Sequence, residues 1–185
     1  AWADRGVACV VTPGWRYTAR DGNGVATGDE GPFVNGQSAE GTTYLVRSDY
    51  FEPLRGRGAG HALSALRRCV DEGRACLLEN HRDNFIGEPG RSSRSCAELS
   101  RLLLEAKERH PDLCWLSTRE LLEILRVRDP VWLVDSSRER LPCVWRRLSG
   151  SGRLWKLLRW SGAAWLGMQL VRLLGVQTGT NAQPT

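Results

Sequence analysis

Residues 42–86 read TTYLVRSDYFEPLRGRGAGHALSALRRCVDEGRACLLENHRDNFI, and this stretch decides the fold class. Thr42–Arg47 is rich in β-branched and aromatic residues and predicts a strand. A helix is predicted over residues 60–73, because the apolar residues recur there at intervals of three and four. They are Leu63, Leu66, Cys69 and Val70. Ala75–Glu79 predicts the next strand, so the stretch is typical of two parallel strands joined by a helical crossover.

The flanking sequence extends this pattern in both directions. Gly6–Thr12 predicts a buried strand before a tight turn, and residues 18–41 predict a long loop rich in Gly, Asp, Asn, Thr and Ser. Such a loop is either functional or a flexible insertion. Downstream, Ser95-x-x-Glu98 and Ser117-x-x-Glu120 have the capping-box pattern that opens a helix. Leu113–Leu116, between these two helices, predicts a fourth strand.

The order of predicted elements indicates an α/β domain over residues 1–128. A complete (β/α) barrel takes about 250 residues, so we expect the C-terminal half of such a barrel, or alternatively a small open α/β sheet. Residues 129–151 are predicted as short strands or a linker, with candidate strands at Val131–Val134 and Leu141–Trp145.

Composition excludes several classes of protein. The chain has 185 residues, of which 41% are hydrophobic and 25% charged, which does not fit collagen, a coiled coil or a wholly disordered chain. Its six cysteines form no C-x-x-C pair and no zinc-finger spacing. Cys76 and Cys114 lie in short apolar runs, where a free cysteine packs as a small hydrophobic residue, which favours a reducing compartment and a cytoplasmic or membrane-associated location. The sequence also contains no P-loop, dinucleotide-binding glycine pattern or G-x-S-x-G elbow.

The C-terminal region is strongly basic. Residues 138–185 carry eight Lys and Arg residues against the single acid Glu139. Residues 152–176 predict a basic, Trp-rich amphipathic helix, and residues 177–185 a disordered tail. The 12 uncharged residues from Trp160 to Val171 are too few to cross a bilayer. The segment 152–174 suits a membrane interface or a protein partner, or alternatively packs on the barrel, and no nucleic-acid partner is expected.

Candidate functional residues follow the second and third predicted strands, because ligands bind at the carboxyl ends of parallel strands. His81 is the candidate catalytic residue, since an imidazole exchanges protons near neutral pH. The alternative is a surface histidine capped by Asp83. Arg47 and Asp49 are candidate substrate-binding residues, although Asp49 could equally form an Asx turn. No histidine pair has metal-binding spacing on a helix.

Two of these segments resemble a known family. Residues 44–53, YLVRSDYFEP, and residues 76–86, CLLENHRDNFI, resemble the C-terminal half of bacterial polysaccharide deacetylase-like proteins. In that family one strand ends in Arg-x-x-x-Phe-Glu-Pro and a later one in His-Arg-x-Asn-Phe. The region from Ser95 to Leu125 also matches the way such domains close, so the resemblance covers about residues 1–128.

The resemblance implies a carbohydrate esterase on a distorted (β/α) barrel. A zinc-type divalent metal, held by one Asp and two His, activates water to attack an acetyl group of a carbohydrate. His81 matches by position the histidine that protonates the leaving amine or alcohol, while Arg47 and Asp49 would line the sugar groove. The Asp and the His-x-x-x-His metal ligands are absent from these 185 residues, so we expect either a fragment that follows a missing first half or a branch of the family without metal. In both cases the chain alone should lack deacetylase activity.

The C-terminal region provides a second hypothesis of a different class. In this alternative the chain is a non-catalytic α/β module that docks to a membrane surface or a protein partner through its basic helix.

Overall fold

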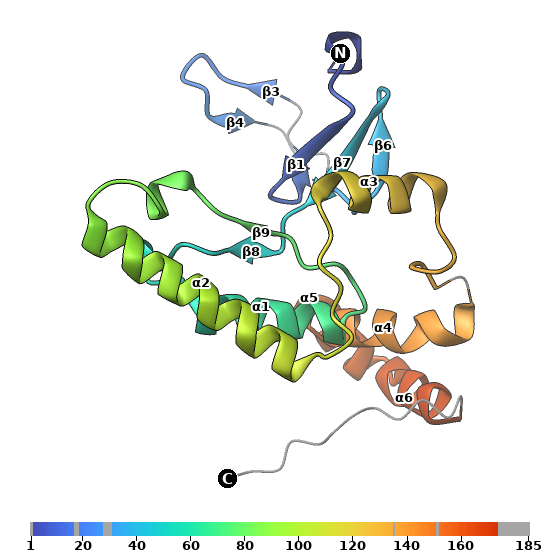
Figure 1. Ribbon diagram of the computed structural model, residues 1–185. Coiled ribbons are helices and arrows are strands. Elements are labelled where there is room, and N and C mark those ends of the chain that lie inside the picture. The colour runs from blue at the N-terminus through green and yellow to red at the C-terminus, as the bar shows by residue number, and fades with distance from the viewer. Residues whose placement is uncertain (1, 17–18, 28–30, 135, 151, 174–185) are drawn as a thin grey trace. The chain divides into compact units, whose positions relative to one another are not determined.

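The chain forms a mixed α/β structure, as its sequence predicts. The computed structural model describes residues 2–16, 19–27, 31–134, 136–150 and 152–173. They divide into two compact units (Figure 1). Unit 1 contains the residues up to Cys69 together with Ala75–Asp129, and unit 2 contains Val70–Arg74 together with the residues from Pro130 onward.

Unit 1 is built on a nearly continuous central strand, β7 (Thr42–Val46) followed by β8 (Asp49–Tyr50). β1 (Cys9–Thr12) runs parallel to β7, and β9 (Leu78–Glu79) runs parallel to β8. The Arg47 N–H donates to Thr12 in β1 at 3.0 Å, whereas the next amide, that of Ser48, donates to Leu77 at 2.7 Å. Because successive N–H groups of a strand point to opposite edges, β1 and β9 flank the central strand on opposite sides. The parallel strands β1, β7–β8 and β9 therefore lie side by side in the same order as in the sequence.

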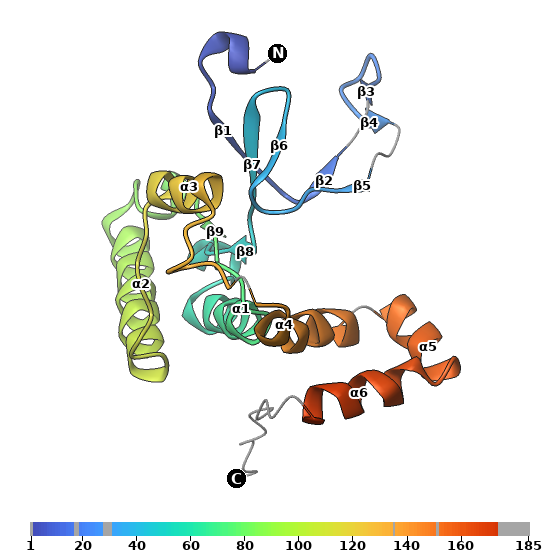
Figure 2. The same cartoon turned by 90° about the vertical axis from the view of Figure 1, so that its right-hand side faces the viewer.

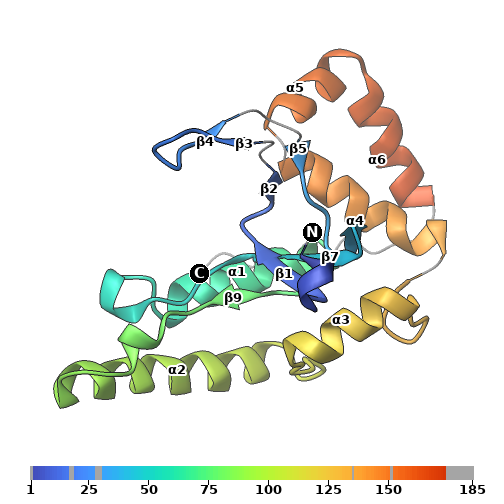
Figure 3. The same ribbon diagram turned by 90° about the horizontal axis from the view of Figure 1, so that it is seen from above.

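The region predicted as a loop over residues 18–41 contains short strands, so that prediction is wrong in part. β3 (Ala19–Arg20) pairs with β4 (Ala26–Thr27), and β2 (Trp15–Arg16) pairs with β5 (Gly31–Pro32), both antiparallel (Figure 3). β6 (Gln37–Ala39) adds an antiparallel strand to β7. Strands of two or three residues are too short to show an alternating hydrophobic pattern, which is why the sequence did not reveal them.

The core of unit 1 lies between two helices, α1 (Ala59–Asp71) and α2 (Pro89–Arg109). The core residues are Phe51, Ala59, Ala62, Leu63, Leu66, Leu102 and Ala106. α1 buries Leu63, Leu66 and Cys69 as its spacing predicts, while Val70 remains exposed. α3 (Thr118–Val127) begins with a complete capping box, in which Ser117 and Glu120 exchange side-chain and backbone hydrogen bonds of 3.2 and 2.6 Å. Figure 2 shows α1, α2 and α3.

Two predicted features of unit 1 are wrong. Ser95 does not open a helix, because α2 already begins at Pro89, and its hydroxyl is buried without a hydrogen-bond partner among the described residues. Residues 113–116 are all described and form no strand. A strand needs a neighbour to supply its hydrogen bonds, and β9 is only two residues long. Among the described residues, the strands form small sheets, and they do not close into a barrel.

Unit 2 is helical, which corrects the predicted strands over 129–151. Residues 131–134 form a turn, and 141–145 lie inside α4 (Ser137–Gly150). The single helix predicted over 152–176 is instead two helices, α5 (Gly152–Trp160) and α6 (Ala163–Leu173), because Gly162 adopts φ +75° between them. The end of the predicted helix, residues 174–176, and the predicted tail 177–185 lie outside the described residues.

Candidate functional site

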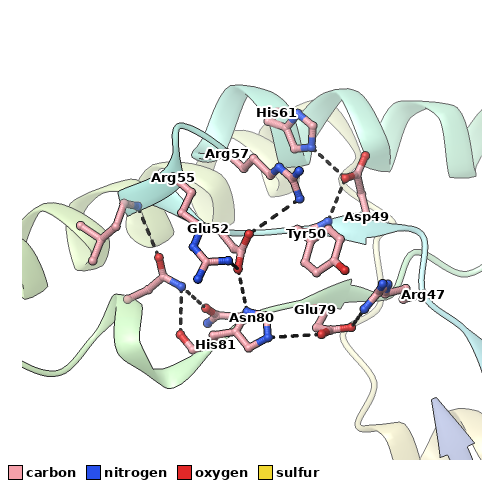
Figure 4. Close-up of polar contacts among 12 residues, drawn as sticks. Arg47, Asp49, Tyr50, Glu52, Arg55, Arg57, His61, Glu79, Asn80 and His81 are labelled. Carbon is pink, nitrogen blue, oxygen red and sulfur yellow. Dashed lines mark hydrogen bonds and ion pairs between the residues drawn. The ribbon is translucent and has the colours of Figure 1, made fainter. Parts of the chain in front are cut away.

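The ends of β8 and β9 bring the two polar segments of the sequence together. Tyr50 stands opposite Glu79 in the parallel ladder, so the residues that follow each strand emerge at the same edge. Glu52 leads into the 3₁₀ turn Pro53–Arg55, and His81 leads into the turn Arg82–Asn84. Their side chains point toward one another (Figure 4). This meeting point, made by Arg47, Tyr50, Glu52, Arg57, Glu79 and His81, is called the strand-end site below.

The centre of the strand-end site is a contact between a buried carboxylate and a half-exposed imidazole. His81 Nδ1 lies 2.6 Å from Glu52 Oε1, and the Glu52 side chain is 3% exposed while that of His81 is 47% exposed. An ionised carboxylate only accepts hydrogen bonds, so Nδ1 is the donor and carries the proton in neutral His81. The other ring nitrogen, Nε2, lies 3.5 Å from Glu79 Oε1. Glu52 thus fixes both the tautomer and the orientation of the ring.

The burial of Glu52 is compensated by three polar partners, two of which are arginines. Besides His81, Arg55 Nη1 lies 3.4 Å from Oε1 and Arg57 Nη1 lies 3.7 Å from Oε2. Burial of an unpaired carboxylate would be costly, and these partners are what permit it. Arg55 and Arg57 also hold the Glu52 carboxylate in position against His81.

Tyr50 forms an aromatic face beside the imidazole. Its ring lies 6.3 Å from the His81 ring with an interplanar angle of 22°. The guanidinium carbons of Arg47 and Arg57 lie 4.3 and 4.8 Å from the ring centroid, both within cation–π range. Arg47 also forms an ion pair with Glu79. Two arginines therefore hold Tyr50 in place and are themselves tied to the acids that contact His81.

Asp49 points away from His81, toward α1. Its Oδ1 lies 2.8 Å from His61 Nε2 and its Oδ2 lies 2.8 Å from Arg68 Nη2. Burial raises the pKa of Asp49, but hydrogen bonds from His61, the Tyr50 amide and Arg68 outweigh it and hold the pKa below its usual range. The Tyr50 amide is the next residue along, so this is not the Asx turn considered from the sequence. Of the three predicted site residues, the structure joins Arg47 to His81 through Glu79 and places Asp49 elsewhere.

A cleft of about 370 Å³ opens beside His81, within the size range of small-molecule sites. It is lined by Glu52, Leu54, Arg55, His81, Asp83, Asn84, Ile86 and Arg91. The buried Asn84 forms part of its wall: Oδ1 accepts from the Leu54 amide at 3.3 Å, and Nδ2 donates to the His81 carbonyl at 2.9 Å. Asn84 therefore ties together the two turns that carry Glu52 and His81.

Sequence reasoning missed the residues that support His81. Neither Glu52 nor Asn84 is among the candidate site residues predicted from the sequence. The one sequence signal is the position of Glu52 between the apolar residues Phe51 and Pro53, both of which the structure buries. A carboxylate buried beside them needs partners, and these are the residues found around it. His61, which is not among the predicted site residues, is the partner of Asp49.

The residues described here do not fit the metal implied by the resemblance. Within the described ranges, no group of three or more His, Cys, Asp or Glu side chains could hold a metal ion. His61 and His81 are committed to separate carboxylates, Asp49 and Glu52. His81 supplies the strand-end site with an imidazole, a group that can exchange a proton near neutral pH.

Comparison of the chain with protein-family models, with curated proteins and with solved structures found no match.

Proposed function

We propose that unit 1 is the acid–base half of a polysaccharide deacetylase-like hydrolase that removes acetyl groups from a carbohydrate. The observation that carries the proposal is the 2.6 Å contact between His81 and the buried Glu52, at the carboxyl ends of neighbouring parallel strands. Ligand sites of parallel α/β folds occur at these ends. The chain order of β1, β7–β8 and β9, with α1 as a crossover, supports the finer assignment to the second half of a (β/α) barrel.

In this proposal His81 acts as a general acid. When the bond between the acyl carbon and the sugar nitrogen or oxygen breaks, Nε2–H of the imidazolium protonates the leaving atom and the ring becomes neutral. Glu52 is a positioning residue, because it stabilises the imidazolium and, by holding Nδ1, keeps Nε2 on the side of the ring that faces away from Glu52. Solvent restores the proton after product leaves. The attack on the acetyl carbonyl is not assigned to any residue of this chain.

The sugar would contact Tyr50 and the adjoining cleft. The face of an aromatic ring packs against the apolar face of a pyranose, and the surrounding ionic groups can hydrogen-bond to its hydroxyls. Arg47 remains a candidate substrate-binding residue because it lies over Tyr50. Asp49 is a weaker candidate, since both of its oxygens already have partners on α1.

The test is binding without turnover. We expect a tetramer of N-acetylglucosamine to shift the NMR signals of residues 47–57 and 79–91, and the chain alone to release no acetate from it. His81→Ala should weaken binding, and Glu52→Gln should alter the His81 ring signals while leaving the fold intact. His110→Ala, at the end of α2, is the matched control and should bind like the unmodified chain.

Two results would overturn the proposal. One is the absence of any shift at the strand-end site with either this oligomer or an O-acetylated xylan oligomer. The other is binding that His81→Ala and His110→Ala affect equally, because the imidazole would then have no specific part in recognition.

A further inference from the structure

The two last helices of unit 2 expose large apolar side chains to solvent. In α5, Leu157 is 64% and Trp160 is 91% exposed, and in α6, Trp165 and Leu166 are each 62% exposed. Leaving such side chains in water forgoes the favourable free energy that burial of apolar surface contributes. Four of them on neighbouring helices mark an interaction surface rather than scattered exposure.

The internal packing of unit 2 does not use these side chains. Trp155 of α5 packs edge-on against Trp145 of α4, with ring centroids 5.4 Å apart. α6 faces inward through Ala164, Gly167 and Val171, and a Cβ on Gly167 would lie 2.2 Å from the Trp145 ring. At 100° per residue, Trp165 and Leu166 lie on the other side of α6 from this stripe. The exposed residues are therefore available to a partner.

The sequence that carries α5 and α6 is basic. From Arg140 to Thr185 the sequence has seven Arg and Lys residues and no acid. Arg146 and Arg147 are occupied, since they donate to backbone carbonyls of Asp71, Glu72 and Gly73 at 2.7–3.3 Å. Lys156 and Arg159 instead lie exposed in α5, next in sequence to Leu157 and Trp160. Cations thus adjoin the exposed apolar residues, while residues 163–171 of α6 carry no charge.

We infer that α5, α6 and the turn between them bind the surface of an anionic phospholipid bilayer. The contact is the Trp160 surface, made by Lys156, Leu157, Arg159, Trp160, Trp165 and Leu166. Indole rings favour the headgroup region, the apolar side chains enter the acyl boundary, and the cations face acidic headgroups. No helix among the described residues is long and apolar enough to cross a bilayer. This inference concerns unit 2 and does not depend on the proposed hydrolase.

The test is sedimentation of the full chain with vesicles. We expect it to pellet with an equal mixture of phosphatidylcholine and phosphatidylglycerol, and much less with phosphatidylcholine alone. Trp160→Ser should lower partitioning about tenfold, and Arg159→Gln about fivefold, the effect of one cation near an anionic surface. Added salt should weaken binding to the mixed vesicles, because it screens the charges.

Matched controls come from unit 1. Trp115→Ser removes an indole that is 57% exposed, and Arg126→Gln removes a guanidinium that is 60% exposed, so both should bind like the unmodified chain. Circular dichroism establishes that each variant is folded. The inference would be overturned if Trp160→Ser, like Trp115→Ser, left partitioning onto the vesicles unchanged. It would also be overturned by self-association that Trp160→Ser abolishes in a chain that binds neither vesicle, since the surface would then be a protein interface.

Discussion

Replacing Glu98 by alanine tests how the N-terminus of α1 is held. Glu98 lies on α2, and its Oε2 accepts a hydrogen bond from the Ala59 amide at 2.7 Å, so one helix caps the other. Ala59 is fully buried, and Gly58 allows the close approach, because a Cβ there would lie 2.2 Å from the same oxygen. The substitution removes a cap and leaves a buried donor without an acceptor. We expect unfolding to become easier by about 1–3 kcal/mol.

The assay is urea unfolding together with amide hydrogen exchange at Ala59. Glu98→Gln keeps an acceptor oxygen and should lose roughly half as much stability. Glu105→Ala removes an exposed ion pair with Arg109 and should cost about 0–1 kcal/mol. The reasoning is refuted if Glu98→Ala is no more destabilising than Glu105→Ala and the Ala59 amide exchanges at an unchanged rate.

The same contact makes a pH-dependent contribution to stability. The hydrogen bond from the Ala59 amide, aided by Arg101, outweighs burial and holds the pKa of Glu98 below its usual range. A carboxyl whose pKa is lower in the folded state stabilises the fold above its unfolded pKa, about 4.3, and loses that effect as the pH falls through the folded value. The stability difference between the unmodified chain and Glu98→Gln should therefore be present at neutral pH and vanish in acid. A difference that persists unchanged in acid would mean that the charge of Glu98 is irrelevant.

Three further substitutions test the packing of each region. Leu102→Ala opens a cavity in the buried core between α1 and α2 and should cost about 2–5 kcal/mol in urea unfolding. Ser117→Ala breaks the capping box of α3 and should cost about 1 kcal/mol, with Thr a near-neutral replacement. Gly73→Ala places a Cβ 2.6 Å from Cys143 Sγ at a residue with φ +59°, so it should destabilise unit 2 by about 1–3 kcal/mol and weaken near-ultraviolet dichroism of the Trp145–Trp155 pair.

The sequence predicts the elements whose pattern is long enough to read. β1, β7, α1 and α3 lie within a few residues of their predicted positions, because each has either a run of β-formers or an amphipathic stripe with a clear end. The short strands over residues 15–39 could not be predicted, since two residues carry no periodicity. The apolar run 113–116 was mistaken for a strand, because local composition does not show whether a neighbouring strand exists to pair with it.

Ser95 and Glu98 show how a local motif can belong to a tertiary contact. Their spacing matches a capping box, yet Glu98 caps the helix that begins at Ala59 instead. A carboxylate can accept hydrogen bonds from the unpaired backbone amides at the N-terminus of any helix within its reach. The local spacing of Ser and Glu does not show whether that helix is their own or a neighbouring one. Ser117 and Glu120, with the same spacing, do form the local box.

At the strand-end site, too, the sequence predicts which segments lie close together but not which side chains make contact. Parallel topology alone places the residues after β8 near those after β9, so the proximity of Glu52 and His81 follows from the strand order. It does not select which acid orients the imidazole. That choice depends on burial: Glu79 is 31% exposed and makes a 3.5 Å contact with Nε2, whereas Glu52 is 3% exposed and makes a 2.6 Å contact with Nδ1. The more buried acid is the one that fixes His81, because a carboxylate removed from water holds its hydrogen-bond partners more tightly.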